Sequence, residues 1–271
     1  MAEVTRPDGE SEADVWTRLR AWTPARIGLG RSGASLPTQA LLDFDLAHAR
    51  ARDAVHAALD TELLLRDLRD SGFGDGLVVR SQARDRMEYL LRPDLGRTLD
   101  AASREELAER ARQSPSCQLA LVVADGLSAA APQRHAIPLL RAMRPEHVTV
   151  VVASQARVAL GDEIGQMLGA DAAIVLIGER PGLSSPDSLG AYLTWAPRIG
   201  CTDAERNCIS NIRPEGLPYA EAARRLTWLL GEARRLQQSG IALKDESDNS
   251  GVGSAFSTPA RGPLLPDAGS V

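Results

Sequence analysis

The stretch from Ala172 to Arg213 holds the groups of this chain that are best suited to bind a ligand. An apolar run that begins at Ala172 stops at Gly178-Glu-Arg-Pro-Gly182, and the polar sequence Asn207-Cys-Ile-Ser-Asn211 follows before the stretch ends. Such a run is typical of a buried parallel strand that opens into a loop, and in open α/β sheets ligands lie at that end of the strands. The sequence therefore predicts a ligand site around Glu179.

A glycine-rich segment near the N-terminus has the spacing of a dinucleotide-binding loop. Gly28-Leu-Gly30-Arg-Ser-Gly33 matches Gly-x-Gly-x-x-Gly, and Asp53 follows at about the offset expected of an acid that binds a ribose. That chemistry also needs a strand before the first glycine and a helix that opens at the last one, so that free amides meet the pyrophosphate. Trp22-Thr-Pro-Ala-Arg26 lacks the pattern of a buried strand. A nicotinamide-dependent oxidoreductase built on Gly28 to Gly33 is therefore the alternative hypothesis.

The histidines and cysteines have no spacing that is typical of a metal site or a catalytic triad. Cys201 and Cys208 are too far apart for a zinc site of the Cys-x2-Cys type. We therefore expect neither a catalytic residue nor a metal ligand in this chain. The residues considered are His48, His56, His135, His147, Cys117, Cys201 and Cys208.

A sheet must position the loop at Glu179, and the second half of the sequence predicts one. Three apolar runs alternate with helical patterns at short spacing, which is typical of βα units. A serine and proline at 185–186 predict the start of a further helix, because proline fits a first helical turn. The predicted strands are 118–124, 148–153, 172–178 and 192–195, and the predicted helices are 103–112, 133–143, 161–168 and 218–238, the last with Gly240 as its cap.

The chain as a whole divides into four predicted regions. Residues 1–14 and 245–271 are polar or rich in Gly, Ser and Pro, so they cannot bury enough apolar surface to offset the entropy lost on ordering. We expect both to be disordered tails. Residues 15–112 are predicted to be mainly helical, with a helix over 38–59 and short extended pieces over 77–80 and 89–92. Residues 113–244 are predicted to form a Rossmann-like domain. The predicted fold class is α/β, with a doubly wound, mostly parallel sheet and a smaller helical N-terminal region.

Composition excludes several classes of protein. The 271 residues carry a net charge of -5, which argues against a nucleic-acid binder because such proteins need a basic stripe. An odd number of cysteines fits a reducing compartment, and no apolar stretch reaches the about 18 residues of a membrane span. We expect a cytoplasmic protein.

Four segments resemble the small subunit of adenosylcobalamin-dependent ethanolamine ammonia-lyase. The first is Ala25-Arg-Ile-Gly-Leu-Gly-Arg-Ser-Gly33 together with Pro37-Thr-Gln-Ala-Leu-Leu42, and the second is Tyr89-Leu-Leu-Arg-Pro-Asp-Leu-Gly-Arg97. The others are Asp125-Gly-Leu-Ser128 and the stretch from Ala172 to Arg213. Together they span nearly everything between the tails.

The resemblance implies a lyase of two kinds of subunit that converts ethanolamine to acetaldehyde and ammonia with an adenosyl radical from the cofactor. It implies that the large subunit holds the substrate and the catalytic residues. The small subunit then closes over the cobalamin with its Rossmann-like domain, within a higher-order oligomer of heterodimers. The expected partners include no nucleic acid and no membrane.

By motif position, the resemblance implies that Val158, Glu179 and Cys208 contact the cobalamin. Glu179 is expected to accept hydrogen bonds from the amides of the corrin, the alternative being an ion pair with Arg180 or Arg157. Val158 is expected to pack on the corrin or its benzimidazole tail, and Cys208 to make close contact from a polar loop. The sequence lacks the Asp-x-His-x-x-Gly motif of modules that replace the lower base, so base-on adenosylcobalamin is expected.

Three further points stay open in the sequence. Some relatives begin with an amphipathic helix that addresses them to a bacterial microcompartment, whereas residues 1–14 are acidic and patternless here, which makes encapsulation doubtful. A non-catalytic assembly subunit that binds the partner but not the cofactor is a second alternative. The helices predicted over 38–59 and 218–238 are both candidates to bind the partner subunit.

Overall fold

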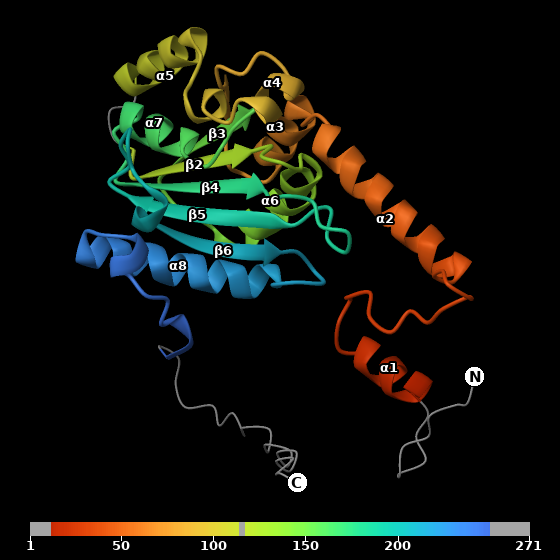
Figure 1. Ribbon diagram of the computed structural model, residues 1–271. Coiled ribbons are helices and arrows are strands. Elements are labelled where there is room, and N and C mark those ends of the chain that lie inside the picture. Colours follow the sequence, from red (N-terminus) through yellow and green to blue (C-terminus); the bar gives the residue numbers. More distant parts are fainter. Residues whose placement is uncertain (1–11, 114–116, 250–271) are drawn as a thin grey trace.

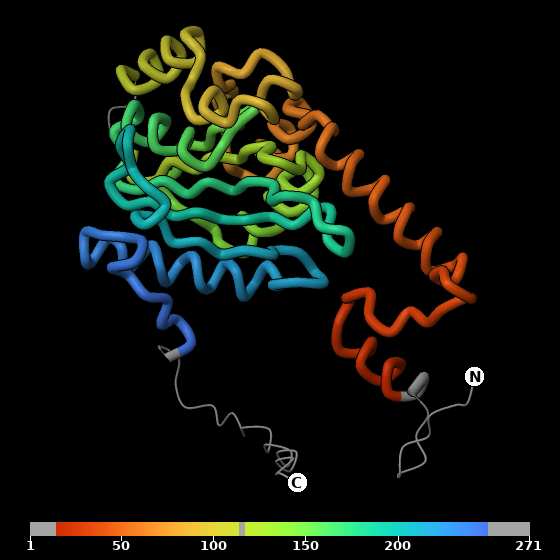
Figure 2. Tube along the Cα trace, in the orientation of Figure 1, coloured from red at the N-terminus to blue at the C-terminus, as the bar shows by residue number. Residues whose placement is uncertain are grey.

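The computed structural model describes residues 12–113 and 117–249 (Figure 1). A six-stranded sheet lies between two layers of helices, and a helical arm extends from it (Figures 1 and 2). The strands are β1 (Leu77–Arg80), β2 (Leu119–Ala124), β3 (Val148–Ser154), β4 (Ala172–Gly178), β5 (Leu189–Trp195) and β6 (Arg206–Ile212). The α-helices are α1 (Glu12–Arg20), α2 (Thr38–His56), α3 (Thr61–Asp70), α4 (Arg86–Leu91), α5 (Ala101–Gln113), α6 (Ala130–Met143), α7 (Leu160–Met167) and α8 (Tyr219–Leu236).

The sheet is mixed, with the strand order β1-β3-β2-β4-β5-β6. The first four strands in this order are parallel to one another, whereas β5 runs antiparallel to both β4 and β6. The class α/β is confirmed, but the sheet is less uniformly parallel than expected. Strand β1 has the bounds of an extended piece expected within the mainly helical region, so the sheet extends across the predicted boundary at residue 112. The other expected piece, 89–92, is wrong, because residues 89–91 belong to α4.

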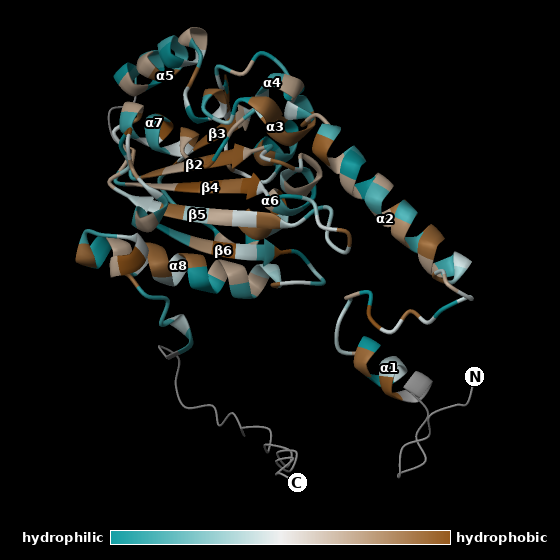
Figure 3. Cartoon of the chain, viewed as in Figure 1, coloured by the Kyte–Doolittle hydropathy of each residue, from teal (hydrophilic) through white to brown (hydrophobic). Residues whose placement is uncertain are grey.

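The central strands form because their apolar residues are buried on both faces. Every residue of β2 and β4 is buried, and Figure 3 shows the apolar residues concentrated in the middle of the sheet. On one face the strands pack with α3, α6 and α8, around Leu121, Ile174 and Leu226. On the other face they pack with α5 and α7, around Val122, Val175 and Ile164. These two cores hold the strand ends in fixed positions.

The loop between β4 and β5 departs from the sequence prediction. The helix expected from Ser185 and Pro186 does not form, and turns lead directly into β5. The segment is instead held by side chains, since the Ser128 hydroxyl donates to the Pro186 carbonyl at 2.8 Å. Arg134 also forms an ion pair with Asp187 at 2.7 Å. A loop without a helix keeps β5 next to β4 and antiparallel to it.

The ends of the described chain differ in how they pack. Helix α8 buries one face on the sheet and ends at Leu236, and the cap residue Gln237 adopts the left-handed conformation expected of Gly240. Helix α2 projects from the sheet as an arm with α1 near its far end (Figures 1 and 2). Helix α1 includes residues 12–14 of the predicted N-terminal tail, and residues 245–249 of the predicted C-terminal tail are described. The rest of both predicted tails, residues 1–11 and 250–271, lies outside the described residues.

Candidate functional site

The carboxyl ends of β2, β3 and β4 meet at one edge of the sheet and surround a cavity of about 230 Å³. The loops after these strands supply most of its wall, and β4, β5 and α4 supply the remainder. Val158 and Glu179, two of the three predicted contact residues, lie in the same wall. The lining residues are Tyr89, Gly126, Leu127, Arg157, Val158, Ile177, Gly178, Glu179, Arg180 and Tyr192.

Glu179 is the first residue after β4, and Ser188 just before β5 and Asn211 of β6 orient its carboxylate. The Ser188 hydroxyl donates a short hydrogen bond to it, and the backbone N–H of Asn211 donates at 3.3 Å. A side chain at Gly190 would come within 2.9 Å of the Glu179 carboxylate oxygen. The glycine therefore lets Glu179 lie across β5, where it stays half-buried with capacity to accept further hydrogen bonds. Among the described residues, Glu179 forms no ion pair with Arg180 or Arg157.

Val158 stands in the loop between β3 and α7. Its side chain is partly buried and packs against the core beneath α7. Val158 therefore contacts the core and also lines the cavity. An apolar wall beside a carboxylate suits a ligand that has both flat apolar surface and hydrogen-bond donors.

Cys208 was expected in a polar loop, and this expectation is wrong. It lies in β6, directly opposite Tyr192 of β5, and its side chain is exposed. Its sulfur is 3.5 Å from the hydroxyl of Ser210, which shares its face of the strand. Strand β6 is at the sheet edge with one covered face, so its sequence alternates and its polar residues resemble a loop.

Tyr192 connects Cys208 to the cavity, although it was not among the predicted site residues. It is paired with Val175 on one side and Cys208 on the other, so all three side chains point to the α7 face of the sheet. Burial, and then the nearby Cys208 and Glu179, raise the pKa of Tyr192 above its ordinary value. Its hydroxyl therefore stays protonated and can donate a hydrogen bond. The alternation of apolar and other residues in Leu189–Trp195 was the available signal for the face to which the Tyr192 side chain points.

The predicted contact residues thus lie on one continuous surface. Val158 and Glu179 line the cavity, and Cys208 lies on the adjoining open face, next to the cavity residue Tyr192. None of the four histidines lines this cavity. Among the described residues, no group of histidine, cysteine and acidic side chains could hold a metal ion.

The Gly28 to Gly33 segment lacks the geometry of a dinucleotide site. It is an irregular loop between α1 and α2, and α2 begins only at Thr38, beyond the last glycine. A helix rather than a strand precedes the loop, and a side chain at Gly28 would collide with Trp16. Asp53 lies within α2, with its side chain 76% exposed. The amides therefore do not converge on one helix end as pyrophosphate binding requires.

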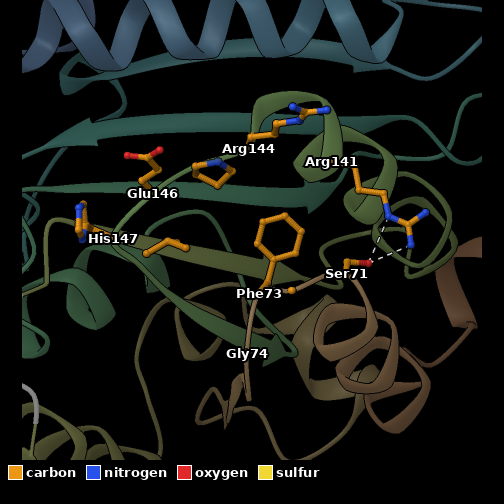
Figure 4. A pocket seen from close by; sticks show the side chains of 10 residues that line it. Ser71, Phe73, Gly74, Arg141, Arg144, Glu146 and His147 are labelled. Carbon is orange, nitrogen blue, oxygen red and sulfur yellow. Dashed lines mark hydrogen bonds between the residues drawn. The ribbon is translucent and has the colours of Figure 1, made fainter.

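A second hollow lies at the opposite, amino-terminal end of the sheet, and Figure 4 shows it from close by. It is open, measures about 870 Å³, and is lined by the segments 71–74 and 144–148 and by Arg141. Arg141 donates to the Ser71 hydroxyl at 3.1 Å. None of the predicted contact residues lies here.

Comparison with known proteins gives the family of the chain. Residues 13–244 match the family model of the ethanolamine ammonia-lyase light chain. The chain belongs to the ethanolamine ammonia-lyase light-chain family. It is 53% identical to the ethanolamine ammonia-lyase small subunit of Pseudomonas putida, over 92% of this chain and 94% of the relative. It is 59% identical to the small subunit of Bradyrhizobium diazoefficiens, over 84% and 90% of the two chains.

Membership of the light-chain family decides between the two main hypotheses. The resemblance seen in four sequence segments is confirmed over nearly all described residues. The nicotinamide-dependent oxidoreductase is not favoured, because neither the family nor the loop geometry supports it. No helix among the described residues is long and apolar enough to cross a membrane.

Proposed function

We propose that this chain is the small subunit of an ethanolamine ammonia-lyase and closes one side of an adenosylcobalamin site. The observation that carries the proposal is the family match over residues 13–244. The large subunit, in this proposal, holds ethanolamine and the catalytic residues, and heterodimers assemble into a larger oligomer. When bound, the cofactor supplies an adenosyl radical that starts the conversion of ethanolamine to acetaldehyde and ammonia.

The cavity fits part of a corrinoid rather than all of it. Cavities that enclose a drug-sized ligand, which is much smaller than a corrinoid, have volumes of about 300–1,000 Å³. This cavity measures about 230 Å³. A corrinoid is a broad, flat ring with amide arms, so only an edge or an appendage enters. The remaining ring surface then lies over Tyr192 and Cys208 on the open face, and a second polypeptide covers its other side.

Each predicted contact residue has a separate task in this proposal. Glu179 accepts hydrogen bonds from amide arms and orients the ring, because Ser188 and Asn211 already fix its carboxylate. Val158 packs on the apolar surface of the cofactor and excludes water there. Cys208 makes van der Waals contact from β6, with no thiol chemistry. The family resemblance implies that the cofactor binds base-on.

The strand order also supports the proposed cofactor site. The order β3-β2-β4, with α7 on one face and α6 on the other, is compatible with a Rossmann-like doubly wound core to which β5 and β6 are added. In such cores ligands bind where the strand order reverses. Val158 follows β3 and Glu179 follows β4, on either side of β2. We propose a cytoplasmic complex.

Of the two helices considered for partner binding, only α2 has a free apolar surface. Helix α8 buries Ala222, Leu226 and Leu229 on the sheet. On α2, Leu41, Leu42, Phe44 and Leu46 are 47, 56, 41 and 51% exposed. Most of the stability of a protein helix comes from packing of its apolar face rather than from helix propensity. We assign this surface of α2 to contact with the large subunit.

The test is to co-express the chain with a large subunit and purify the complex. We expect the complex to retain adenosylcobalamin, seen by visible absorption, and to release ammonia and acetaldehyde from ethanolamine. The small subunit alone should be inactive. Ammonia release by the single chain would contradict the proposed division of labour, and a complex without corrinoid would contradict the cofactor site. An active complex whose cobalamin affinity is unchanged by Glu179→Ala would favour the assembly subunit.

A further inference from the structure

The loop that carries Arg157 and Val158 into the cavity turns at a residue with an unfavourable backbone conformation. Gln155 has a φ of +54°, in the left-handed region that residues other than glycine rarely adopt. Such conformations persist only where the surrounding structure holds them, and they gather at functional sites. The contacts that hold this turn therefore decide where Val158 stands.

Asp125 holds the turn from the amino side. One carboxylate oxygen accepts the backbone N–H of Gln155 at 2.9 Å, and the other accepts the N–H of Ala156 at 3.0 Å. Asp125 is only 4% exposed. Its burial raises the carboxyl pKa, against the effect of these amides and of Arg86, whose guanidinium lies 3.5 Å away.

Tyr89 holds the same turn from the carboxyl side. Its hydroxyl donates to the carbonyl of Ala156 at 3.0 Å. The guanidinium carbons of Arg86 and Arg157 lie 4.7 and 4.2 Å from the centre of its ring, which fixes the ring by cation–π contact. Ala156 is thus bonded at its N–H by Asp125 and at its carbonyl by Tyr89, two residues before Val158.

Arg86 ties this cluster to the rest of the site. Its guanidinium donates to the carbonyl of Gly126, a residue of the cavity wall, at 2.8 Å. It also donates to the carbonyl of Val55, near the end of α2, at 2.6 Å. The cluster therefore joins the loops after β2 and β3 with α4 and the arm, all at the edge of the sheet that holds the cavity.

We propose that Asp125 and Tyr89 are positioning residues of the cobalamin site, which clamp Ala156 and thereby hold Val158 against the cofactor. The inference rests on the proposed function. Tyr89 is 0% exposed and Asp125 is 4% exposed, so both act through the loop and not mainly by touching the cofactor. Each therefore affects cobalamin affinity only through the position of Val158.

A double-mutant cycle on the complex of small and large subunits tests this role, with cobalamin affinity as the readout. We expect Tyr89→Phe to weaken affinity about fivefold, as the loss of one neutral hydrogen bond allows, and Asp125→Asn about tenfold or more. In a Val158→Ala background both effects should shrink to under about twofold, because residues that act through one another are not additive. In a Cys208→Ala background they should keep their full size.

Two outcomes overturn the proposal. Equal effects in the Val158→Ala and Cys208→Ala backgrounds would mean general destabilisation, and no effect in either would mean that the clamp does not control binding. Asp125→Asn leaves Arg86 without its charged partner and can fail to fold, so Tyr89→Phe, which changes no charge, decides alone in that case. A wild-type complex that binds no cobalamin refutes the proposed function itself, whereas an unaffected Tyr89→Phe complex refutes only the clamp.

Discussion

Strands β5 and β6 present two faces that differ sharply in how they are covered. On the α8 side, Leu189, Leu193, Ile209 and Ile212 are at most 5% exposed. On the α7 side, Thr194 and Arg206 at one end are buried, with Arg206 paired to Asp162 of α7. At the end beside the cavity, Cys208 and Ser210 are exposed and Tyr192 is only half-buried, and this part is the open face. The main helix contacts of these two strands come from α6 and α8, whereas α7 packs over β2 and β4.

The difference separates the part of the sheet that stabilises the fold from the part that is free to bind. An antiparallel pair can leave one face to water, so the open face needs no partner for stability. Its side chains are polar or small rather than large and aliphatic, unlike a surface made only to bury another protein. Its position beside Glu179 and Val158 makes it the continuation of the cavity.

The largest expected effect comes from the covered face. Leu226 of α8 is 1% exposed, and Leu226→Ala should lower the free energy of unfolding by about 2–5 kcal/mol, through lost burial and a residual cavity. Urea denaturation of the isolated chain measures this. Cys208→Ala, on the opposite face, should change stability by less than about 0.5 kcal/mol. Similar losses in both variants would remove the distinction between the faces.

The next effect concerns binding at the edge of the open face. Glu179→Ala should weaken cobalamin binding by the complex about 10- to 100-fold, which is the usual range for hydrogen bonds to a charged group. Equilibrium titration monitored by visible absorption gives the affinity. Glu179→Gln keeps an acceptor for Ser188 and should lose less. The matched control is Glu215→Ala, whose carboxylate is 74% exposed and outside the cavity; a loss as large there would argue against a specific role for Glu179.

A smaller effect is expected on the arm, a third surface without intrachain cover. Leu42→Ser on α2 should weaken association of the two subunits about tenfold, because an exposed leucine loses its apolar contact with the partner. Analytical ultracentrifugation measures the association. Arg50→Ser on the same helix serves as the control and should have little effect. If the Leu42→Ser chain associated with the large subunit as tightly as wild type, α2 would not make the proposed contact.

The smallest effect is a pH dependence on the covered side, where α8 begins. The His135 ring accepts or donates a hydrogen bond at 2.8 Å with the Tyr219 hydroxyl and lies 3.5 Å from Asp187. Burial lowers the pKa of His135, despite the attraction of Asp187. The unfolded chain therefore binds a proton at higher pH than the folded one, so stability falls as pH drops below the unfolded value of about 6.5.

Comparison of wild type with His135→Gln isolates that contribution. Wild type should lose more stability between about pH 7 and pH 5 than the variant does. Thermal unfolding at several pH values measures the difference. Parallel curves for the two proteins would show that His135 does not contribute in this range.

The sequence predicted the covered core well and the open face poorly. Strand β4 was predicted with its observed bounds, Ala172–Gly178, because an unbroken apolar run has few alternatives. Strand β6 was interpreted as a loop, since Asn207, Cys208 and Ser210 are polar and only Ile209 and Ile212 face the core. Local patterns detect burial, but they do not show which face a distant helix covers.

The candidate site shows the same limit. Family resemblance placed Val158, Glu179 and Cys208 by motif position, and the structure brings them onto one surface, although their contact with the cofactor stays a prediction. Tyr89 and Tyr192 join the cavity only through folding, from segments far from Glu179 in sequence. The helix predicted at Ser185 was wrong because that loop is held by Ser128, in the turn before α6, and by Arg134 of α6. The local sequence does not reveal these contacts.

Alkylation of Cys208 is the most direct test of the claim that cobalamin covers the open face. Cys208 is the exposed cysteine of this chain, whereas Cys117 and Cys201 are buried and serve as internal controls. The rate of modification by iodoacetamide, followed by mass spectrometry, should be compared in the complex of both subunits with and without adenosylcobalamin. We predict that Cys208 reacts in the cofactor-free complex and is protected about tenfold or more when cobalamin is bound at saturation. Equal rates in the two states, with cobalamin demonstrably bound, would contradict the account.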